Sequence, residues 1–337
     1  MQVITGIRND GCHYLDGPGA YEWWYADALS DDGEWGVVII LFRGMPMSPT
    51  YLDDPEHMLA GCAVSVYHNG VRLAFSFTEQ PLESASYARD EVRVQMDGAS
   101  IVVDETGLLT ACVDMPCDTD ERRVAVTLRG QPTRCIDPLP ADLSDKHAWV
   151  LARPRMQTTA SIQLMEGSTV VVDHTFETTG YHDHNLGVRA MHHDFAGWYW
   201  GRVHCQDRTI VFLSTPRSGD TTHEVYEIDV DGVAKAWHDV EITYGKTFIT
   251  AMGLLCSRHI RLRGISPTTG PHEVSCTNSI ACEDSPFYQR YISDWFIDGT
   301  AVGKGMSEYM NVARMKSAWI RPFLRLPLIN ILSQVER

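Results

Sequence analysis

The sequence predicts an all-β protein that is built from two barrel or sandwich halves, with an N-terminal domain over residues 1–165 and a C-terminal domain over 166–337. Short apolar runs rich in Val, Ile, Thr and aromatic residues suit half-buried strands, and turn signals separate them. Helical patterns are few, and the absence of a GxGxxG motif, a P-loop and a regular strand–helix alternation argues against nucleotide-binding folds. A chain of 337 residues is long enough for two domains of roughly 150 residues.

Tight hairpins order the predicted strands along the chain. Asx-Gly pairs favour positive φ at both central turn positions. Three such pairs separate strand-like segments: Asn69-Gly70, Asp97-Gly98 and Asp231-Gly232. Residues 161–176 predict a further hairpin around Glu166-Gly167. Additional strands are predicted over 35–42, 123–130 and 209–215.

Two segments depart from the strand pattern. Residues 304–319 are the best helix candidate, although Gly305 and Asn311 weaken the helical pattern. The Pro- and charge-rich stretch 130–146 predicts a loop near the junction of the two halves.

The composition argues against several classes of protein. Lys and Arg number 28 and Asp and Glu number 44, which gives a formal net charge of −16. Such an acidic chain is a poor general binder of nucleic-acid phosphates. The nine cysteines are scattered without a CxxC pair, and the N-terminal residues lack a basic region followed by an apolar stretch, so we expect reduced thiols and a cytoplasmic protein. No window of 18 apolar residues is present, so we expect no membrane-spanning segment.

The C-terminal segment differs from the rest of the acidic chain. From Tyr309 to Val335 there is no Asp or Glu, and basic residues alternate with apolar ones, among them Arg314, Lys316, Trp319, Arg321, Phe323 and Arg325. Pro322 and Pro327 exclude one long helix. One interpretation is a final strand followed by a tail that docks on the core. The other is a basic, apolar patch that touches a membrane surface and makes the protein peripheral to the membrane.

A short polar motif, Tyr181-His182-Asp183-His184-Asn185, has the residue types of a proton-transfer site. In a strand, Tyr181, Asp183 and Asn185 share one face, and the two histidines share the other. An acid flanked by a phenol and an amide is a proton donor with a partner that positions water. The alternative is an Asx-type turn with satisfied polar groups.

Other aromatic side chains are candidates for a pocket around this proton-transfer site. His147 and Trp149 project together if their segment is extended, although a histidine beside a tryptophan is more often packed in a core. Clustered aromatic residues are either core or the wall of a pocket for an apolar or cationic ligand. The candidate walls are Trp23, Trp24, Trp198 and Trp200.

A metal site and a nucleophilic hydrolase site are both disfavoured. Four histidines lie near two aspartates in the sequence: His182, His184, His192 and His193 with Asp183 and Asp194. Imidazoles are common ligands, but there is no HExxH motif, and a strand would place only two of the histidines on one face. There is no GxSxG motif either. We therefore expect neither a metal nor another cofactor.

Five segments in order resemble the carotenoid 1,2-hydratase family, also called hydroxyneurosporene synthase. They are EWWYADALSDDGEWGVVIILF (22–42), HAW followed by Arg153-Pro154, GYHDHN, FAGWYWGR and CEDSPFYQRY (282–291). The family belongs to a wider lipocalin-like group that includes natural-product cyclases and pericyclases. The resemblance implies two lipocalin-like β domains, an apolar pocket and no cofactor.

The resemblance also implies roles for particular residues. The family's HxW motif falls on His147 and Trp149, its YxDxN motif falls on Tyr181, Asp183 and Asn185, and the Asp is the expected proton donor. The sequence departs from the hydratases where His182 and His184 flank the Asp and where Val188-Arg189 follow Gly187. These departures bear on the substrate more than on the fold.

The chemistry of alkene protonation favours the same residues. A carboxyl group buried among aromatic rings keeps its proton at neutral pH, and aromatic faces stabilise a carbocation. We expect a lyase that protonates a C=C bond of an apolar isoprenoid through Asp183 and adds water, with Tyr181 and His147 tuning the acid or placing the water and Trp149 stabilising the cation. The alternatives are a cyclase or pericyclase acting on a terpenoid or polyene, and a non-catalytic carrier of an apolar ligand.

Overall fold

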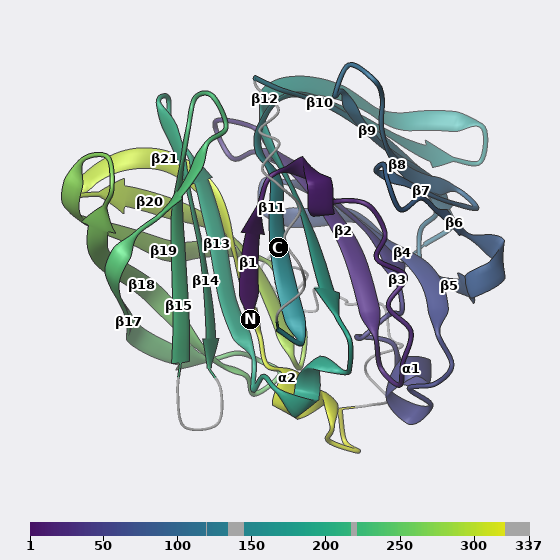
Figure 1. Ribbon diagram of the computed structural model, residues 1–337. Coiled ribbons are helices and arrows are strands. Elements are labelled where there is room, and N and C mark those ends of the chain that lie inside the picture. Colours follow the sequence, from purple (N-terminus) through teal and green to yellow (C-terminus); the bar gives the residue numbers. More distant parts are fainter. Residues whose placement is uncertain (119, 134–144, 217–220, 321–337) are drawn as a thin grey trace. The chain divides into compact units, whose positions relative to one another are not determined.

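The computed structural model describes residues 1–118, 120–133, 145–216 and 221–320, and the described part is almost entirely β-strand (Figure 1). It divides into two compact units. The first holds Met1–Ser30, Trp35–Tyr67 and Leu73–His193, and the second holds Asp31–Glu34, His68–Arg72 and the chain from Asp194 onward. The boundary expected between residues 165 and 166 falls at the end of a strand of the first unit.

The first unit is a curled sheet that has twelve strands within the described residues (Figure 1). Its strands are β1 Gln2–Thr5, β2 Tyr21–Leu29, β3 Trp35–Arg43, β4 Leu59–His68, β5 Val71–Pro81, β6 Ser86–Tyr87, β7 Arg93–Met96, β8 Ala99–Val103, β9 Leu109–Pro116, β10 Arg122–Pro132, β11 His147–Glu166 and β12 Thr169–Gly187. The spatial order is β5-β4-β3-β2-β12-β11-β10-β9-β8-β7-β6, and β1 pairs in parallel with β11. Four short helices connect the strands: η1 Ile7–Asn9, α1 Pro49–Asp53, η2 Leu82–Ser84 and η3 Met191–His193.

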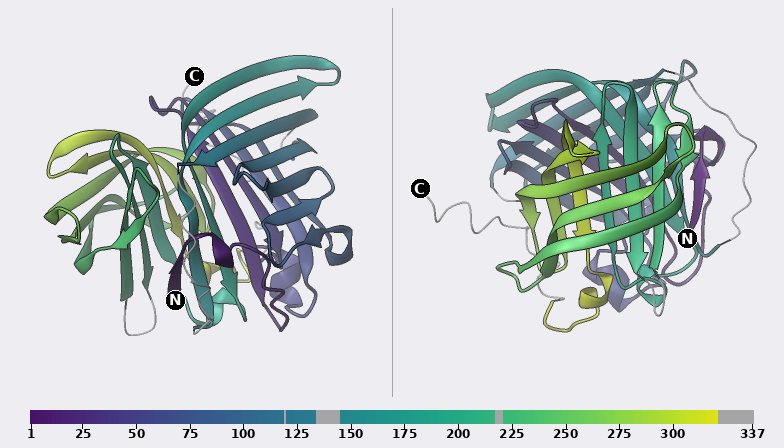
Figure 2. Two further views of the ribbon diagram at one scale, coloured as in Figure 1. Left: turned by 45° about the horizontal axis from the view of Figure 1, so that its top comes forward. Right: turned by 90° about the vertical axis from the view of Figure 1, so that its left-hand side faces the viewer.

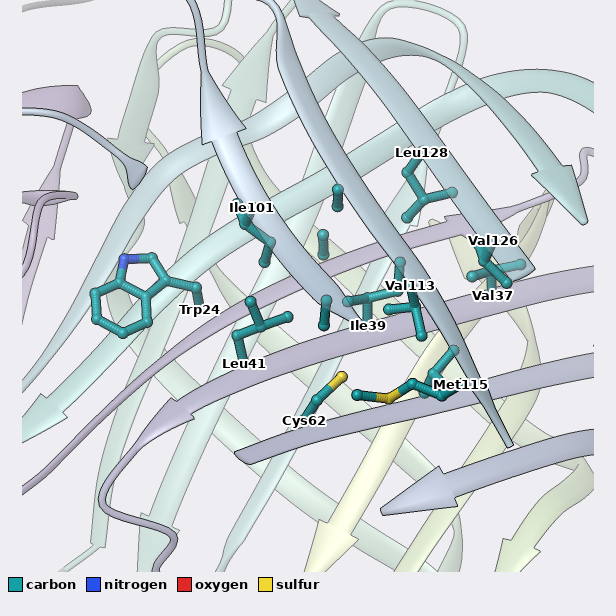
Figure 3. Packing of buried hydrophobic residues seen from close by; sticks show 14 of the residues in the cluster. Trp24, Val37, Ile39, Leu41, Cys62, Ile101, Val113, Met115, Val126 and Leu128 are labelled. Atoms are coloured by element: carbon teal, nitrogen blue, oxygen red, sulfur yellow. The ribbon is translucent and has the colours of Figure 1, made fainter. Parts of the chain in front are cut away.

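The core of the first unit lies on one face of this sheet. Alternate residues of its strands are apolar and buried, because side chains of a strand point to opposite faces in turn. Figure 3 shows part of the cluster, with Trp24, Ile39, Leu41 and Ile101 packed together with Val113. The other face of β2, β11 and β12 is therefore free to carry different side chains.

The second unit is a nine-stranded curled sheet within the described residues (Figure 2). Its elements are β13 Trp198–His204, β14 Arg208–Pro216, β15 Thr221–Asp229, β16 Ala234–Ala236, β17 His238–Ile249, β18 Leu255–Ser266, β19 Gly270–Asp284, β20 Tyr288–Ile297, β21 Thr300–Met310 and the short helix α2 Val312–Met315. The order is β16-β15-β14-β13-β21-β20-β19-β18-β17. Phe212, Ile260 and Trp295 lie in its core. Two sheets of this kind confirm the predicted all-β fold with two lipocalin-like domains.

The predicted hairpins and strands are present. Asn69 and Gly70 have φ angles of 51° and 74° and join β4 to β5, as the Asx-Gly signal predicts. At the other two Asx-Gly pairs only the glycine has positive φ, 71° at Gly98 and 83° at Gly232. The hairpin predicted over 161–176 joins β11 to β12, and the strands predicted over 35–42, 123–130 and 209–215 lie within β3, β10 and β14.

The helix predicted over 304–319 is wrong. Its first part, 304–310, is the end of β21, which pairs with β13 on one side and with β20 on the other, and only the short α2 is helical. These two sets of backbone hydrogen bonds outweigh a weak helical pattern. A Cβ atom on Gly305 would lie 2.3 Å from the carbonyl oxygen of Arg202, so the glycine permits a close approach of strands. Asn311 caps the N-terminus of the short α2, where its Oδ1 accepts from the N–H of Arg314 at 3.1 Å.

Parts of two predicted segments lie outside the described residues. In the acid-free segment, Arg314, Lys316 and the highly exposed Trp319 are described, whereas Arg321, Phe323 and Arg325 are not. Most of the loop predicted over 130–146 is also outside. Among the described residues, no helix has the length and apolar character needed to cross a membrane.

Candidate active site

Strand β12 carries a polar cluster on the face opposite to the apolar core. The Tyr181 hydroxyl donates to Oδ2 of Asp183 at 2.7 Å, and the Asn185 side-chain amide donates to Oδ1 at 3.0 Å. The predicted sharing of one face by these three residues is therefore confirmed. Asp183 is 4% exposed and Tyr181 is 0% exposed, so the cluster is withdrawn from water.

Trp149 of β11 completes the contacts of this carboxyl group. Its indole Nε1 donates to Oδ2 of Asp183 at 2.7 Å. Trp149 is the Cα partner of Asn185 across the two strands, so its indole reaches Asp183 two residues away along β12. Oδ2 accepts two hydrogen bonds in these contacts, and Oδ1 accepts one.

The pairing of β11 with β12 is irregular at this point. Val150 pairs with His184, Arg153 pairs with His182, and Met156 pairs with Gly180. Each interval contains one more residue on β11 than on β12, so β11 is bulged opposite Asp183 and again opposite Tyr181. Such bulges re-aim side chains and are over-represented beside active sites.

A second pair of polar side chains lies further along the same face. The Tyr21 hydroxyl and Nδ1 of His147 are 2.9 Å apart, and Trp23 stacks on Tyr21 with ring centroids 5.0 Å apart. Gly187 lies between the two strands that supply the Tyr21–His147 pair. A Cβ atom there would lie 2.5 Å from His147 Nδ1, so only glycine fits beside this pair.

Trp24, a candidate pocket wall, lies away from the polar cluster. Trp24 is on the opposite face of β2 from Trp23, because adjacent residues of a strand alternate. Its indole Nε1 donates to the carbonyl oxygen of Asp10 at 2.8 Å, and its ring stacks on His184 at 4.3 Å (Figure 3 shows it in the core).

Trp198 and Trp200 belong to β13 of the second unit. Trp200 is buried and is the Cα partner of Glu308 on β21, whereas Trp198 is half-buried. They share one face of β13, as their spacing predicts.

A charged network on the core face of β12 was missed by the sequence analysis. His182 and Arg153 both contact the carboxylate of Asp10, and His184 Nε2 lies 3.5 Å from Oε2 of Glu22. These side chains are at most 4% exposed. Their one signal in the sequence was the pair of histidines that flank Asp183.

The partners of Asp10 and Glu22 lower the pKa of each carboxyl group by more than burial raises it. Burial raises the pKa of Asp10, but His182 and Arg153 bring it well below its ordinary value. Burial likewise raises the pKa of Glu22, but His184 and the backbone N–H groups of His13 and Leu15 lower it to about 2.

No group of three or more His, Cys, Asp or Glu side chains within the described part of the chain is arranged to hold a metal ion. The rings of His192 and His193 lie beside each other at the end of η3, with centroids 4.3 Å apart and planes tilted by 45°. What the described site offers is a buried carboxyl group, three hydrogen-bond donors and aromatic faces. This arrangement suits acid–base chemistry on an apolar molecule.

Comparisons with known proteins identify the family that this chain resembles. Residues 39–330 match the model of the family described as carotenoid hydratase CrtC. A protein named hydroxyneurosporene dehydrogenase from Chlorobaculum tepidum is 25% identical over 96% of this chain and 91% of its own length. The acyclic carotenoid 1,2-hydratase of Rhodobacter capsulatus is 25% identical over 85% of this chain and 95% of its own length. That of Rubrivivax gelatinosus is 29% identical over 60% of this chain and 50% of its own length.

Solved structures share the fold at low identity. A protein described as AttH from Nitrosomonas europaea has a TM-score of 0.64 at 16% identity and covers 90% of this chain and 95% of its own. CghA has a TM-score of 0.58 at 12% identity over 87% and 88% of the two chains. Kievitone hydratase from Nectria haematococca has a TM-score of 0.52 at 10% identity over 92% and 96%.

Proposed function

The chain belongs to the carotenoid hydratase family CrtC, and from this premise we propose that it is a hydro-lyase that adds water to a C=C bond of an acyclic carotenoid or a similar isoprenoid. Asp183 is the proton donor in this proposal. The family supports hydratase chemistry, and the names of the relatives point to an apolar polyene substrate.

The observation that carries the proposal is the surroundings of the Asp183 carboxyl group. Burial favours its neutral acid form, and the donors Trp149 and Tyr181 favour the carboxylate that remains after proton transfer. The site therefore supports both states of a catalytic cycle.

The proposed reaction balances without a cofactor. The proton of Asp183 and the π electrons of the alkene form a new C–H bond, which leaves a carbocation on the other carbon. A water oxygen then bonds to that carbon, and its surplus proton returns to the Asp183 carboxylate. The net change is the addition of one water.

The neighbouring residues have matching roles in this proposal. The faces of Trp149 and Tyr181 stabilise the cation through their quadrupoles. The Tyr21–His147 pair, 2.9 Å apart, and the Asn185 amide are polar groups on the same face that can place the water. Trp23 lies beside them as an apolar wall.

The test is Asp183→Asn, with Asp173→Asn as a matched control on the exposed part of β12. An amide cannot give a proton to carbon, so we expect turnover to fall by about 10²–10⁴-fold while polyene binding persists. The control should retain full activity. Asp183→Asn activity within about tenfold of the unmodified protein would contradict the role of Asp183.

Isotopes identify the reaction. With an acyclic carotenoid in H₂¹⁸O, a hydratase places ¹⁸O in the product, and in D₂O it places deuterium on carbon. A product isomeric with the substrate and free of ¹⁸O would instead identify a cyclase. Binding without any product would identify a carrier.

A further inference from the structure

Arg153 occupies a singular position in the pairing of β11 with β12. It is the residue between the two bulges, and it pairs with His182, the neighbour of Asp183. The bulge on one side lies opposite Asp183, and the bulge on the other lies opposite Tyr181. Contacts that fix the Arg153–His182 pair therefore also fix the course of the β11 backbone beside Asp183 and Tyr181.

The Asp10 carboxylate holds this pair from outside the two strands. Nε2 of His182 is 3.0 Å from Oδ1 and 3.1 Å from Oδ2, and Nη1 of Arg153 donates to Oδ2. Asp10 is fixed in turn, because its carbonyl oxygen accepts from Trp24 Nε1 and its N–H donates to the carbonyl of Ile7. Asp10 and His182 are both 0% exposed, so water does not compete for these contacts.

The hydrogen bonds determine the protonation of His182. Its Nδ1 is 2.9 Å from the carbonyl oxygen of Tyr25 on β2, and a carbonyl can only accept. Its Nε2 faces the Asp10 carboxylate, which also accepts from Nη1 of Arg153, so this partner is an acceptor as well. Both ring nitrogens must then carry protons. The charged groups around the ring are Asp10 and Arg153, with His184 further along β12 and its partner Glu22 on β2.

We propose that Asp10 and His182 are positioning residues for the reaction of Asp183: the Asp10 carboxylate, shared by Arg153 and an imidazolium at His182, holds the bulged segment of β11 so that Trp149 meets Asp183. This inference rests on the proposed function for its catalytic consequence. The residues act from the core face of β12 and do not touch the substrate. They bind β12 to β2 through Tyr25, to β11 through Arg153, and to the end of η1 through Asp10.

The first measurement is kinetic. Asp10→Asn removes the charge but keeps the shape of the side chain. His182→Gln removes the imidazole that contacts the Asp10 carboxylate. We expect kcat to fall by about 10- to 100-fold with a small change in KM, because small misplacements of reacting groups have effects of this size. Asp10→Glu, which restores the charge, should recover part of kcat. Val113→Ala, a truncation in the same core, serves as the control for lost stability.

The second measurement needs no activity. The Nε1–H resonance of Trp149 in a ¹H–¹⁵N spectrum, assigned by its loss in Trp149→Phe, reports the bond to Asp183. We expect it to shift and to exchange faster with solvent in Asp10→Asn and His182→Gln, but not in Val113→Ala. In the unmodified protein, the ¹⁵N resonances of His182 should show two protonated ring nitrogens at pH 7.

The outcomes separate the two proposals. A folded Asp10→Asn protein with an unchanged Trp149 resonance and unchanged kcat overturns this inference, as does a neutral His182 ring. An active Asp183→Asn protein overturns the proposed function instead, while the Trp149 resonance still tests the positioning by Asp10. If Asp10→Asn does not fold, the same readings are taken on His182→Gln.

Discussion

Trp149 and Asp183 lie 34 residues apart in the sequence, yet the indole N–H of one donates to the carboxyl group of the other at 2.7 Å. The contact joins β11 to β12 beside a bulge, so it depends on the local course of β11. Because the hydroxyl of Tyr181 donates to the same oxygen, the carboxyl group is held in one orientation from two strands. Substitutions at Trp149 therefore separate hydrogen bonding from ring contact.

Trp149→Phe keeps an aromatic face but removes the N–H donor, whereas Trp149→Ala removes both. We expect the phenylalanine variant to retain more activity, because a phenyl face keeps part of the cation stabilisation. The alanine variant should also lose about 3–5 kcal/mol of stability, since Trp149 is 1% exposed. Turnover and melting curves measured together distinguish the two effects. If both variants lose activity only in proportion to their unfolding, the cation role is wrong.

Gly187→Ala tests the Tyr21–His147 pair without changing either residue. The new methyl group would lie 2.5 Å from His147 Nδ1, so the imidazole has to move. We expect lower turnover and a stability loss of about 1–3 kcal/mol, as for other overpacked sites. The control is Gly245→Ala, whose Cβ would meet its nearest neighbour at 3.8 Å. Equal effects of the two substitutions would show that the pair has no special role.

Glu22 should make the fold sensitive to acid. Its folded-state pKa is lowered to about 2, because His184 and two backbone N–H groups outweigh burial, against an ordinary value of 4.5. The resulting stability is fully present above pH 4.5 and is lost as the pH falls toward 2, with a total on the order of 3 kcal/mol. Melting temperatures between pH 2 and 7 should therefore vary less in Glu22→Gln. The exposed Glu177→Gln is the control, and an unchanged pH dependence in Glu22→Gln would contradict the assignment.

The acid-free C-terminal segment is expected to bind anionic lipid weakly. A long carotenoid is nearly insoluble in water, so an enzyme that uses it must collect it from a bilayer. Each basic residue near an anionic surface contributes about 1 kcal/mol, and Trp319, which is 85% exposed, can enter the headgroup layer. We predict salt-sensitive cosedimentation with anionic vesicles, reduced by Trp319→Ala and by Arg321→Glu/Arg325→Glu. Absence of binding at low salt would favour a tail that docks on the protein.

Local signals in the sequence predict local structure well in this chain. The turn at Asn69-Gly70 follows from backbone preferences of two adjacent residues, and the common face of Tyr181 and Asp183 follows from strand alternation. The same alternation, applied to Trp23 and Trp24, would have shown that adjacent residues cannot both line one pocket.

Long-range features could not be predicted in this way. Asp10 is 172 residues from His182 and 143 from Arg153, and nothing in its own segment marks it as their partner. The bulges of β11 depend on how two strands are paired, which a single segment does not encode. The failed helix at 304–319 has the same origin, because β13 and β20 supply the hydrogen bonds that make its first part a strand.

The alternation along β12 has a consequence for laboratory evolution. In a scan of every substitution over residues 181–185, the odd positions should lower turnover more than protein abundance. The even positions should lower abundance more, because His182 and His184 are tied to buried acids. Mutational tolerance would then repeat with a period of two. Libraries that seek new substrates would do best to leave Asp183 and both histidines unchanged.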